Sequence, residues 1–179
     1  QIITVLIPAY NEADKIKKTI IALKTSKHVN RIVVIDDGSE DGTFLAAKEI
    51  GAESYKLSKN RGKGYAINFG VNKIADNSDI VVFLDADLAD TASEVDKLII
   101  PLLQNEADVT IAKFPPAKRK GGFGLVKKLA RWGIRYYTGH TIHTSLSGQR
   151  AFKSKVLKNI HHTYSGYGIE VGMTIDILN

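Results

Sequence analysis

Cysteine is absent from this 179-residue chain, and so are long apolar runs. Without cysteine there is no disulfide framework, no cysteine-ligated zinc site and no thiol nucleophile. No apolar run approaches the ~18 residues that a membrane-spanning helix needs, and repeats and low-complexity segments are also missing. The composition is 44% apolar and 25% charged, which is typical of a globular domain with an ordinary hydrophobic core.

Acidic residues are scarce in the second part of the chain. Residues 109–179 hold 12 Lys and Arg but two acidic residues, a net charge of +10, whereas residues 1–108 carry −4. A uniformly basic protein would suggest nucleic acid, but this charge is confined to one half and no nucleic-acid-binding module is recognisable. We therefore expect two surfaces with different tasks, and no nucleic-acid partner.

The first 113 residues alternate short apolar strands with amphipathic helices. Strands are expected at 2–7, 31–35, 53–57, 80–84 and 108–113, and helices at 11–24, 39–50, 64–74 and 92–103. Asn11 and Ser39 are predicted to cap the first two helices, and Pro101 to interrupt the fourth. Because the strands are apolar throughout, helices should cover both faces of a mostly parallel, Rossmann-like α/β sheet.

The pattern changes at residue 114, which divides one domain into a first half (1–113) and a second half (114–179). A helix at 123–137, a polar loop at 138–147, a strand at 149–152 and a helix from 168 are expected there. Gln1 stands where an initiator Met is expected, and the last helix shows no C-cap. We expect this sequence to be trimmed at its start and the natural protein to continue beyond Asn179. Without a visible signal peptide, we expect the protein to be cytoplasmic.

Polar side chains are concentrated where the predicted strands end, which is where open parallel sheets bind ligands. Asp85 and Asp87 follow the apolar strand at 80–84. Two close carboxylates repel one another unless a cation compensates them, and hard oxygen ligands beside a diphosphate suit Mg²⁺ or Mn²⁺. The alternative is that one of these aspartates simply caps a helix at a strand–helix turn.

Two further turns carry groups suited to a nucleotide. Asp36–Ser39 (DDGS) is a tight turn, and turn geometry explains its Gly and Ser but not its two adjacent carboxylates, one of which can accept a base N–H. Gly62–Gly64 (GKG) opens a helix, so its backbone amides and the Lys63 ammonium could meet a phosphate. The alternative for the second turn is an ordinary solvated loop.

Together with the first strand end, these motifs resemble a known family. The segments are VLIPAYNE at 5–12, VIDDGSEDGT at 34–43, GKG at 62–64 and LDAD at 84–87. Their order and spacing are similar to the family 2 glycosyltransferases of the GT-A fold, over essentially the whole chain. Nucleotidyltransferases are rejected because they would show a Gly-x-Gly-x-Arg loop where this chain has Pro8–Glu12.

The resemblance implies a metal-dependent glycosyltransferase that moves glucose or a similar sugar from a UDP-sugar to an anionic acceptor. It implies that Asp37 binds the uracil-like edge, that Ala86 packs near the ribose and that Lys63 lies near the phosphates. Asp85 and Asp87 correspond to the Mg²⁺- or Mn²⁺-binding pair, with Asp87 the more direct ligand. The residues implied to line the base are Pro8, Ala9, Tyr10 and Glu12.

The second half is similar to the glucosyl-3-phosphoglycerate synthase group, a retaining branch that uses UDP-glucose. The similar segments are 121–122 (GG), 146–152 (LSGQRAF), 166–172 (GYGIEVG) and 175–176 (ID). By this resemblance Glu170 lies near the sugar or the acceptor, the 146–149 loop lies near the reacting centre, and Glu170 and Asp87 are the candidate catalytic residues. Where the group has Arg-x-Thr, this chain has Gly124–Val126, which argues against phosphoglycerate as acceptor. No histidine is assigned to the metal.

Three interpretations of the basic helix at 123–137 stay open. It is a solvated surface helix, an anionic acceptor site, or an interfacial helix lying on acidic lipid. The third fits the alternative function, a membrane-docked polyprenyl-phosphate glycosyltransferase, which the 146–152 segment also resembles. The expected partners are therefore a nucleotide-sugar donor and an anionic small-molecule or lipid-phosphate acceptor. Peripheral membrane contact and a homodimer remain open.

Overall fold

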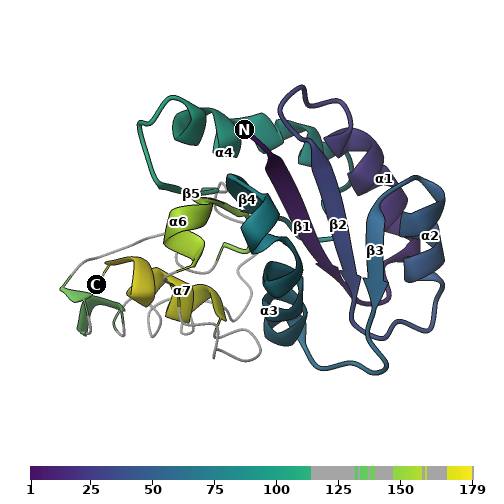
Figure 1. The fold of residues 1–179 in the computed structure, drawn as a ribbon. Coiled ribbons are helices and arrows are strands. Elements are labelled where there is room, and N and C mark those ends of the chain that lie inside the picture. The colour runs from purple at the N-terminus through teal and green to yellow at the C-terminus, as the bar shows by residue number, and fades with distance from the viewer. Residues whose placement is uncertain are drawn as a thin grey trace, which may run out of the picture.

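The computed structural model describes residues 1–113, 132, 134–136, 138–139, 147–158, 160 and 169–178. At its centre is a six-stranded sheet in the order β3-β2-β1-β4-β6-β5 (Figure 1). The strands are β1 (Ile3–Ala9), β2 (Arg31–Asp36), β3 (Glu53–Lys56), β4 (Ile80–Phe83), β5 (Val109–Ile111) and β6 (Arg150–Lys153). Strands β3, β2, β1 and β4 are parallel, whereas β6 runs antiparallel to both β4 and β5. The prediction of a mostly parallel sheet is confirmed.

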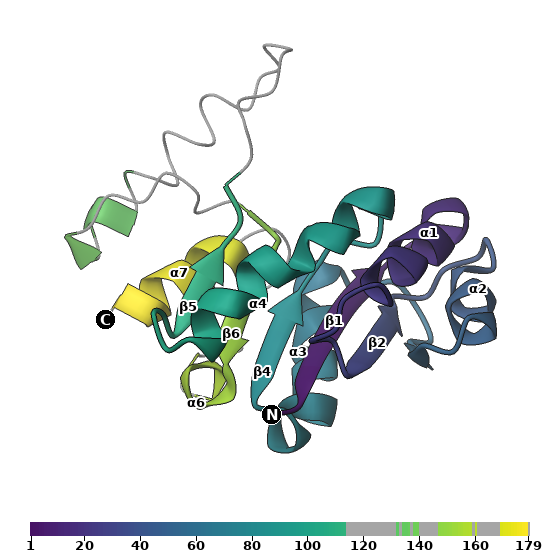
Figure 2. The same cartoon turned by 90° about the horizontal axis from the view of Figure 1, so that it is seen from above.

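Helices cover both faces of this sheet (Figures 1 and 2). The described helices are α1 (Ala13–Leu23), α2 (Thr43–Glu49), α3 (Lys63–Ile74), α4 (Asp96–Leu103), α6 (Ser154–Leu157) and α7 (Ile169–Leu178), with 3₁₀ segments η1 (Ala75–Asn77) and η2 (Ala89–Val95). Alternate residues of β1 serve the two faces, since Val5 and Ile7 pack toward α1, α2 and α4 while Leu6 packs toward α3, α6 and α7. Burial on both faces explains why the strand sequence is apolar throughout.

The predicted capping roles of Asn11 and Ser39 are wrong. Helix α1 begins at Ala13 and α2 begins only after Gly42, and neither has a side-chain cap. Instead, the backbone N–H of Asn11 donates to the Ser39 hydroxyl (2.9 Å), and the Asn11 side-chain carbonyl accepts from the N–H of Glu40 (3.1 Å). Both polar side chains thus join the loop after β1 to the loop after β2, which fixes two adjacent strand ends.

The segment predicted as one helix at 92–103 is divided in the structure. Its first part belongs to the 3₁₀ segment η2, and helix α4 follows from Asp96. Pro101 does not interrupt α4, which continues to Leu103. Pro101 has no N–H, so the carbonyl of Lys97 lacks its helical donor, but this one missing bond does not end the helix.

Only parts of the second half are described. The strand expected at 149–152 is present as β6, and the helix expected from 168 is present as α7. Of the helix expected at 123–137, Trp132 and residues 134–136 are helical, and Thr138, expected in a loop, is helical too. The remainder of that helix and the loop up to residue 146 lie outside the described residues, so the division at 113/114 stays a prediction. None of the helices in the described ranges is both long and apolar enough to cross a membrane.

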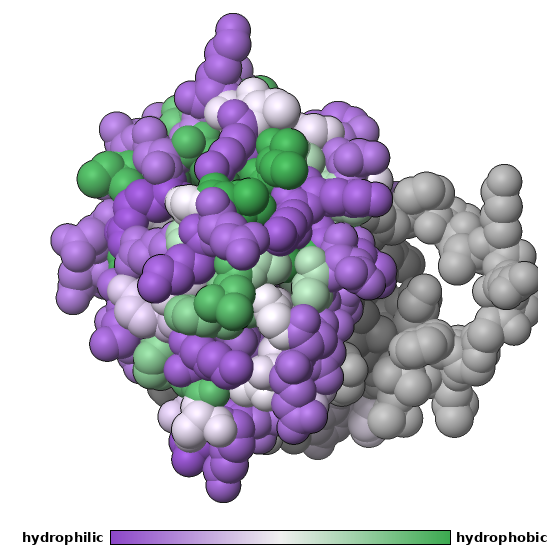
Figure 3. All heavy atoms as spheres, turned by 90° about the vertical axis from the view of Figure 1, so that its right-hand side faces the viewer, coloured by the Kyte–Doolittle hydropathy of each residue, from purple (hydrophilic) through white to green (hydrophobic). Residues whose placement is uncertain are grey.

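The outer surface over the β3 side of the sheet is mainly hydrophilic (Figure 3). Apolar side chains on this face form small groups separated by hydrophilic ones. Exposed apolar residues in the described ranges include Ile21 on α1 and Leu45 on α2. Scattered exposure of this kind is ordinary for a globular surface and marks no binding site.

Candidate active site

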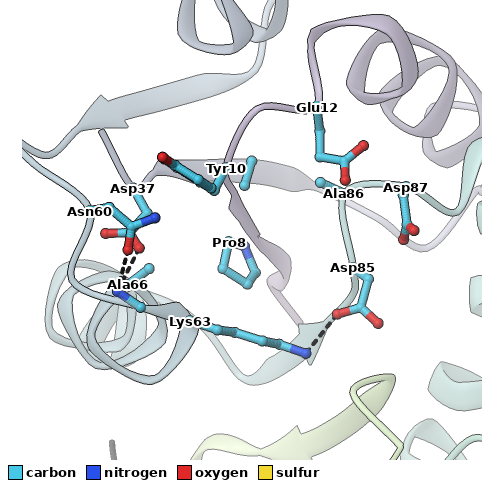
Figure 4. Close-up of a pocket in the computed structure, with 12 residues that line it drawn as sticks. Pro8, Tyr10, Glu12, Asp37, Asn60, Lys63, Ala66, Asp85, Ala86 and Asp87 are labelled. Carbon is cyan, nitrogen blue, oxygen red and sulfur yellow. Dashed lines mark hydrogen bonds and ion pairs between the residues drawn. The ribbon is translucent and has the colours of Figure 1, made fainter. Parts of the chain in front are cut away.

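One cavity of about 540 Å³ opens at the carboxyl ends of β1, β2 and β4 (Figure 4). It is lined by Pro8, Ala9, Tyr10, Glu12, Asp37, Asn60, Gly62, Lys63, Ala66, Asp85, Ala86 and Asp87. Every first-half residue that the sequence assigned to a nucleotide or metal site is in this set. The parallel strands bring these residues together, although they are up to 79 positions apart in the sequence. Their binding roles stay predictions.

Asp37 is a buried carboxylate that holds the loop after β3. Its two oxygens accept hydrogen bonds from the backbone N–H groups of Arg61 (2.8 Å) and Gly62 (2.7 Å). Each carboxylate oxygen has a second lone pair, so a base N–H can still be accepted from the cavity side. Asp37 therefore both shapes the wall of the cavity and leaves an acceptor available to a ligand.

Gly38 allows that loop to approach. Its φ is +76°, and a Cβ built there would lie 2.6 Å from the backbone carbon of Lys59 and 2.7 Å from the backbone nitrogen of Asn60. Both the left-handed backbone and the close approach exclude a side chain at this position. The glycine of the DDGS turn thus lets the loops after β2 and β3 form one wall.

Lys63, at the start of α3, links the two halves of the chain. Its Nζ lies 2.7 Å from Asp85 Oδ1 and 2.9 Å from Glu170 Oε1 on the first turn of α7. Burial alone would lower the pKa of Lys63, but the negative charges of Asp85 and Glu170 outweigh it and raise that pKa above its ordinary value. The ammonium is therefore charged at neutral pH and bridges two carboxylates.

A second buried cation, Arg150, interacts electrostatically with Glu170. Arg150, at the start of β6, is 1% exposed. Its Nε donates to the carbonyl of Ser147 (2.8 Å) and its Nη1 to the hydroxyl of Thr174 (3.0 Å). Burial lowers the pKa of Arg150 to about 10, opposed by the charge of Glu170. Glu170, itself buried, therefore lies in the field of two cations.

The two aspartates of the LDAD motif have different surroundings. Asp85 accepts from Lys63 on Oδ1 and from the side-chain amide of Gln149 on Oδ2. Asp87 is exposed and, within the described part of the chain, has no hydrogen-bond or ion-pair partner. In that same part, no cluster of three or more His, Asp or Glu side chains suited to a metal is found. Two carboxylates facing an open cavity fit a divalent cation that takes its other ligands from a diphosphate and water.

Sequence reasoning did not single out every residue of the site. It assigned the 146–149 loop to the reacting centre by resemblance, and Gly148 and Gln149 do lie against Asp85, whereas Leu146 is outside the described residues. Asn60 and Ala66 line the cavity without having been singled out. The contact between Gln149 and Asp85 could have been inferred from the position of Gln149, just before a strand that pairs with β4.

The fold and this cavity define an α/β protein with a candidate ligand site at the strand ends, lined by paired carboxylates and a lysine. The chain belongs to glycosyl transferase family 2, whose family model matches residues 4–167. This confirms the resemblance that the four motifs indicated. The class to which the chain belongs is thus the family 2 glycosyltransferases.

Two of the known proteins similar to this chain are named for different acceptors. An uncharacterised protein of Methanocaldococcus jannaschii is 33% identical over 88% of this chain and 67% of its own length. The UDP-N-acetylglucosamine–dolichyl-phosphate N-acetylglucosaminyltransferase of Methanococcus voltae is 29% identical over 88% of this chain and 72% of its own length. Glucosyl-3-phosphoglycerate synthase of Mycobacterium tuberculosis, solved with Mn²⁺, UDP-glucose and phosphoglyceric acid, has a TM-score of 0.79 at 27% identity, over 97% of this chain and 63% of that one. The chain therefore spans less than two thirds of that structure.

Proposed function

We propose that this chain binds a UDP-sugar together with Mg²⁺ or Mn²⁺ in the cavity and transfers the sugar to a phosphate-bearing acceptor. The observation that carries the proposal is the convergence of the predicted donor residues on a single cavity. The M. tuberculosis structure, with Mn²⁺ and UDP-glucose, supports the choice of donor and metal.

Within this proposal Asp37 receives the base, while Pro8, Ala9, Tyr10 and Glu12 line its pocket and Ala86 packs near the ribose. Asp85 and Asp87 hold the cation, which when bound supplies positive charge that stabilises the departing diphosphate. The Lys63 ammonium, 2.7 Å from Asp85, adds a second positive charge beside the phosphates.

Glu170 is proposed to hold sugar or acceptor hydroxyls rather than to act as a general base. Its Oε1 is already engaged by Lys63 at 2.9 Å, and Arg150 lies close behind it. An inverting enzyme needs a base on the acceptor side. The geometry therefore favours retention of the anomeric configuration, as the resemblance of the second half implies.

A screen of nucleoside-diphosphate sugars by thermal unfolding tests the donor and the metal. UDP-sugars with Mn²⁺ are expected to raise Tm by about 5 °C at a hundredfold excess over Kd, because only the folded chain binds them. The same sugars without Mn²⁺, and GDP- or CDP-sugars with Mn²⁺, serve as controls and should give smaller shifts. No shift with any nucleotide sugar and Mn²⁺ would contradict the proposal.

A membrane-docked polyprenyl-phosphate glycosyltransferase is the second candidate. The observation that favours it is a stacked aromatic pair, Trp132 and Tyr136, which are 66% and 71% exposed with ring centroids 5.6 Å apart. Arg135, between them in sequence, is exposed as well. Exposed aromatic and basic side chains on a helix are typical of contact with an anionic lipid surface. The relative from Methanococcus voltae, named for a dolichyl-phosphate acceptor, supports the same direction.

Sedimentation with phosphatidylglycerol vesicles tests this second candidate. We expect binding at low salt that weakens as salt is added, since exposed cations contribute to it. The double variant Trp132→Ser/Tyr136→Ser should reduce the bound fraction about tenfold, because two interfacial aromatic rings are lost. Ile21→Ser, on the exposed side of α1, is the matched control. Equal sedimentation of wild type with neutral and anionic vesicles would exclude the candidate.

A further inference from the structure

Asp85 is held from both sides by donors of different charge. The Lys63 ammonium bonds Oδ1 and the neutral side-chain amide of Gln149 bonds Oδ2. An ammonium neutralises a carboxylate as well as orienting it, whereas an amide orients it without cancelling its charge. The two contacts therefore have separate physical consequences. Gln149 is not among the residues proposed to bind the donor.

Sheet pairing brings Gln149 to this place. Strand β6 runs antiparallel to β4 with Arg150 opposite Phe83, so the residue before β6 lies beside the residues that follow β4. The backbone carbonyl of Gln149 accepts from the N–H of Ala112 (2.9 Å), which ties it to the end of β5 as well. The backbone of Gln149 is thus fixed by the sheet on both sides.

The side chain of Gln149 is equally constrained. Only 7% of the residue is exposed. Its carbonyl Oε1 accepts from the Ser147 hydroxyl at 3.1 Å, and its NH₂ group faces Asp85 because a carboxylate can only accept. The amide therefore has one orientation that satisfies both of its ends.

Gly148 lets the chain pass directly against the Lys63–Asp85 pair. A Cβ at Gly148 would lie 2.6 Å from Lys63 Nζ and 2.9 Å from each carboxylate oxygen of Asp85. Real Cβ atoms do not approach this closely, so a side chain here would push the pair apart or push Gln149 away from it. The approach of the 147–149 segment depends on this glycine.

The geometry points to Gln149 as a positioning residue that orients the Asp85 carboxylate toward the cation of the donor site. This inference rests on the proposed function, since the cation is part of that proposal. Gln149 touches neither the donor nor the cation in this scheme and acts through Asp85. Its neutrality matters, because the amide adds no second positive charge beside the carboxylate proposed to bind a divalent cation.

Calorimetric titration with UDP, in the presence and absence of Mn²⁺, tests the inference on Gln149→Met. Methionine keeps the length and volume of the side chain but cannot donate to Asp85. We expect UDP affinity with Mn²⁺ to fall about tenfold, the range for a lost hydrogen bond to a charged group, and affinity without Mn²⁺ to stay the same. Gln149→Leu, which also cannot donate to Asp85, should produce the same Mn²⁺-selective loss. Gln104→Met, at the exposed end of α4, is the matched control.

The outcomes separate this inference from the proposed function. Wild type that binds UDP no more tightly with Mn²⁺ overturns both. Wild type with Mn²⁺-dependent binding and a Gln149→Met variant that retains it overturns the positioning role alone. An equal loss with and without Mn²⁺ also overturns it, because it would mean that Gln149 only packs. Should Gln149→Met fail to fold in a melting experiment, Gln149→Leu decides between the same outcomes.

Discussion

Asp87→Ala is expected to lose Mn²⁺-dependent UDP binding while remaining as stable as wild type. Asp87 is exposed and, among the described residues, has no hydrogen-bond or ion-pair partner, so its removal leaves no buried group unsatisfied. It nevertheless lines the cavity next to Asp85, where it is one of two carboxylates proposed to hold the cation. UDP affinity with Mn²⁺ should fall by roughly 10–100-fold, toward the value measured without metal.

Asp87 is a cleaner probe than Asp85 for this purpose. Asp85→Ala would leave the Lys63 ammonium and the Gln149 amide without their shared acceptor, so a loss of binding would mix several causes. The matched control is Asp90→Ala, an exposed aspartate three residues away that does not line the cavity. Titration calorimetry gives the affinities and urea unfolding gives the stabilities. Unchanged Mn²⁺-dependent binding by the Asp87 variant would argue against a cation at the LDAD motif.

The sequence predicted a mostly parallel sheet and most of the cavity for a physical reason. Apolar segments bounded by turn residues locate the strands, and parallel strands necessarily present their carboxyl ends at one edge. Asp37, Lys63 and Asp85 could therefore be placed together without coordinates. Placing the strand ends at one edge requires only the order of strands and helices along the chain. Local apolar patterns and turn residues predict that order well.

Contacts between loops could not be predicted in the same way. Asn11 and Ser39 have the chemistry of helix caps, yet their side chains bond to one another's loops because β1 and β2 are neighbours in the sheet. The 146–149 loop was placed near the reacting centre by resemblance, but the contact of Gln149 with Asp85 was not predicted. Asp85 is 64 positions away and meets Gln149 through the antiparallel pairing of β6 with β4. The local sequence shows which hydrogen bonds a side chain can make, whereas the pairing of the strands decides which partner it meets.

Lys63→Met is expected to weaken UDP binding about 10–100-fold while leaving uridine binding unchanged, because the ammonium is proposed to meet the phosphates and not the base. Lys63→Arg should retain much of the affinity, since it keeps the charge. Titration calorimetry with UDP and uridine, both with Mn²⁺, provides the comparison. Lys18→Met, on an exposed position of α1, is the matched control. Equal losses for uridine and UDP would contradict a phosphate role for Lys63.

The same substitution should also cost stability, which separates the two tasks of Lys63. Methionine would leave Asp85 and the buried Glu170 without their shared cation, at a cost of about 1–3 kcal/mol in urea unfolding. The pKa of Lys63 is raised in the folded chain, so this stabilisation is present below the ordinary lysine pKa and is lost only as pH rises through the raised value. The stability difference between wild type and Lys63→Met should therefore be constant across the neutral range. A difference that disappears as the pH rises from acidic to neutral would mean that the bridge to Asp85 and Glu170 depends on a group other than Lys63.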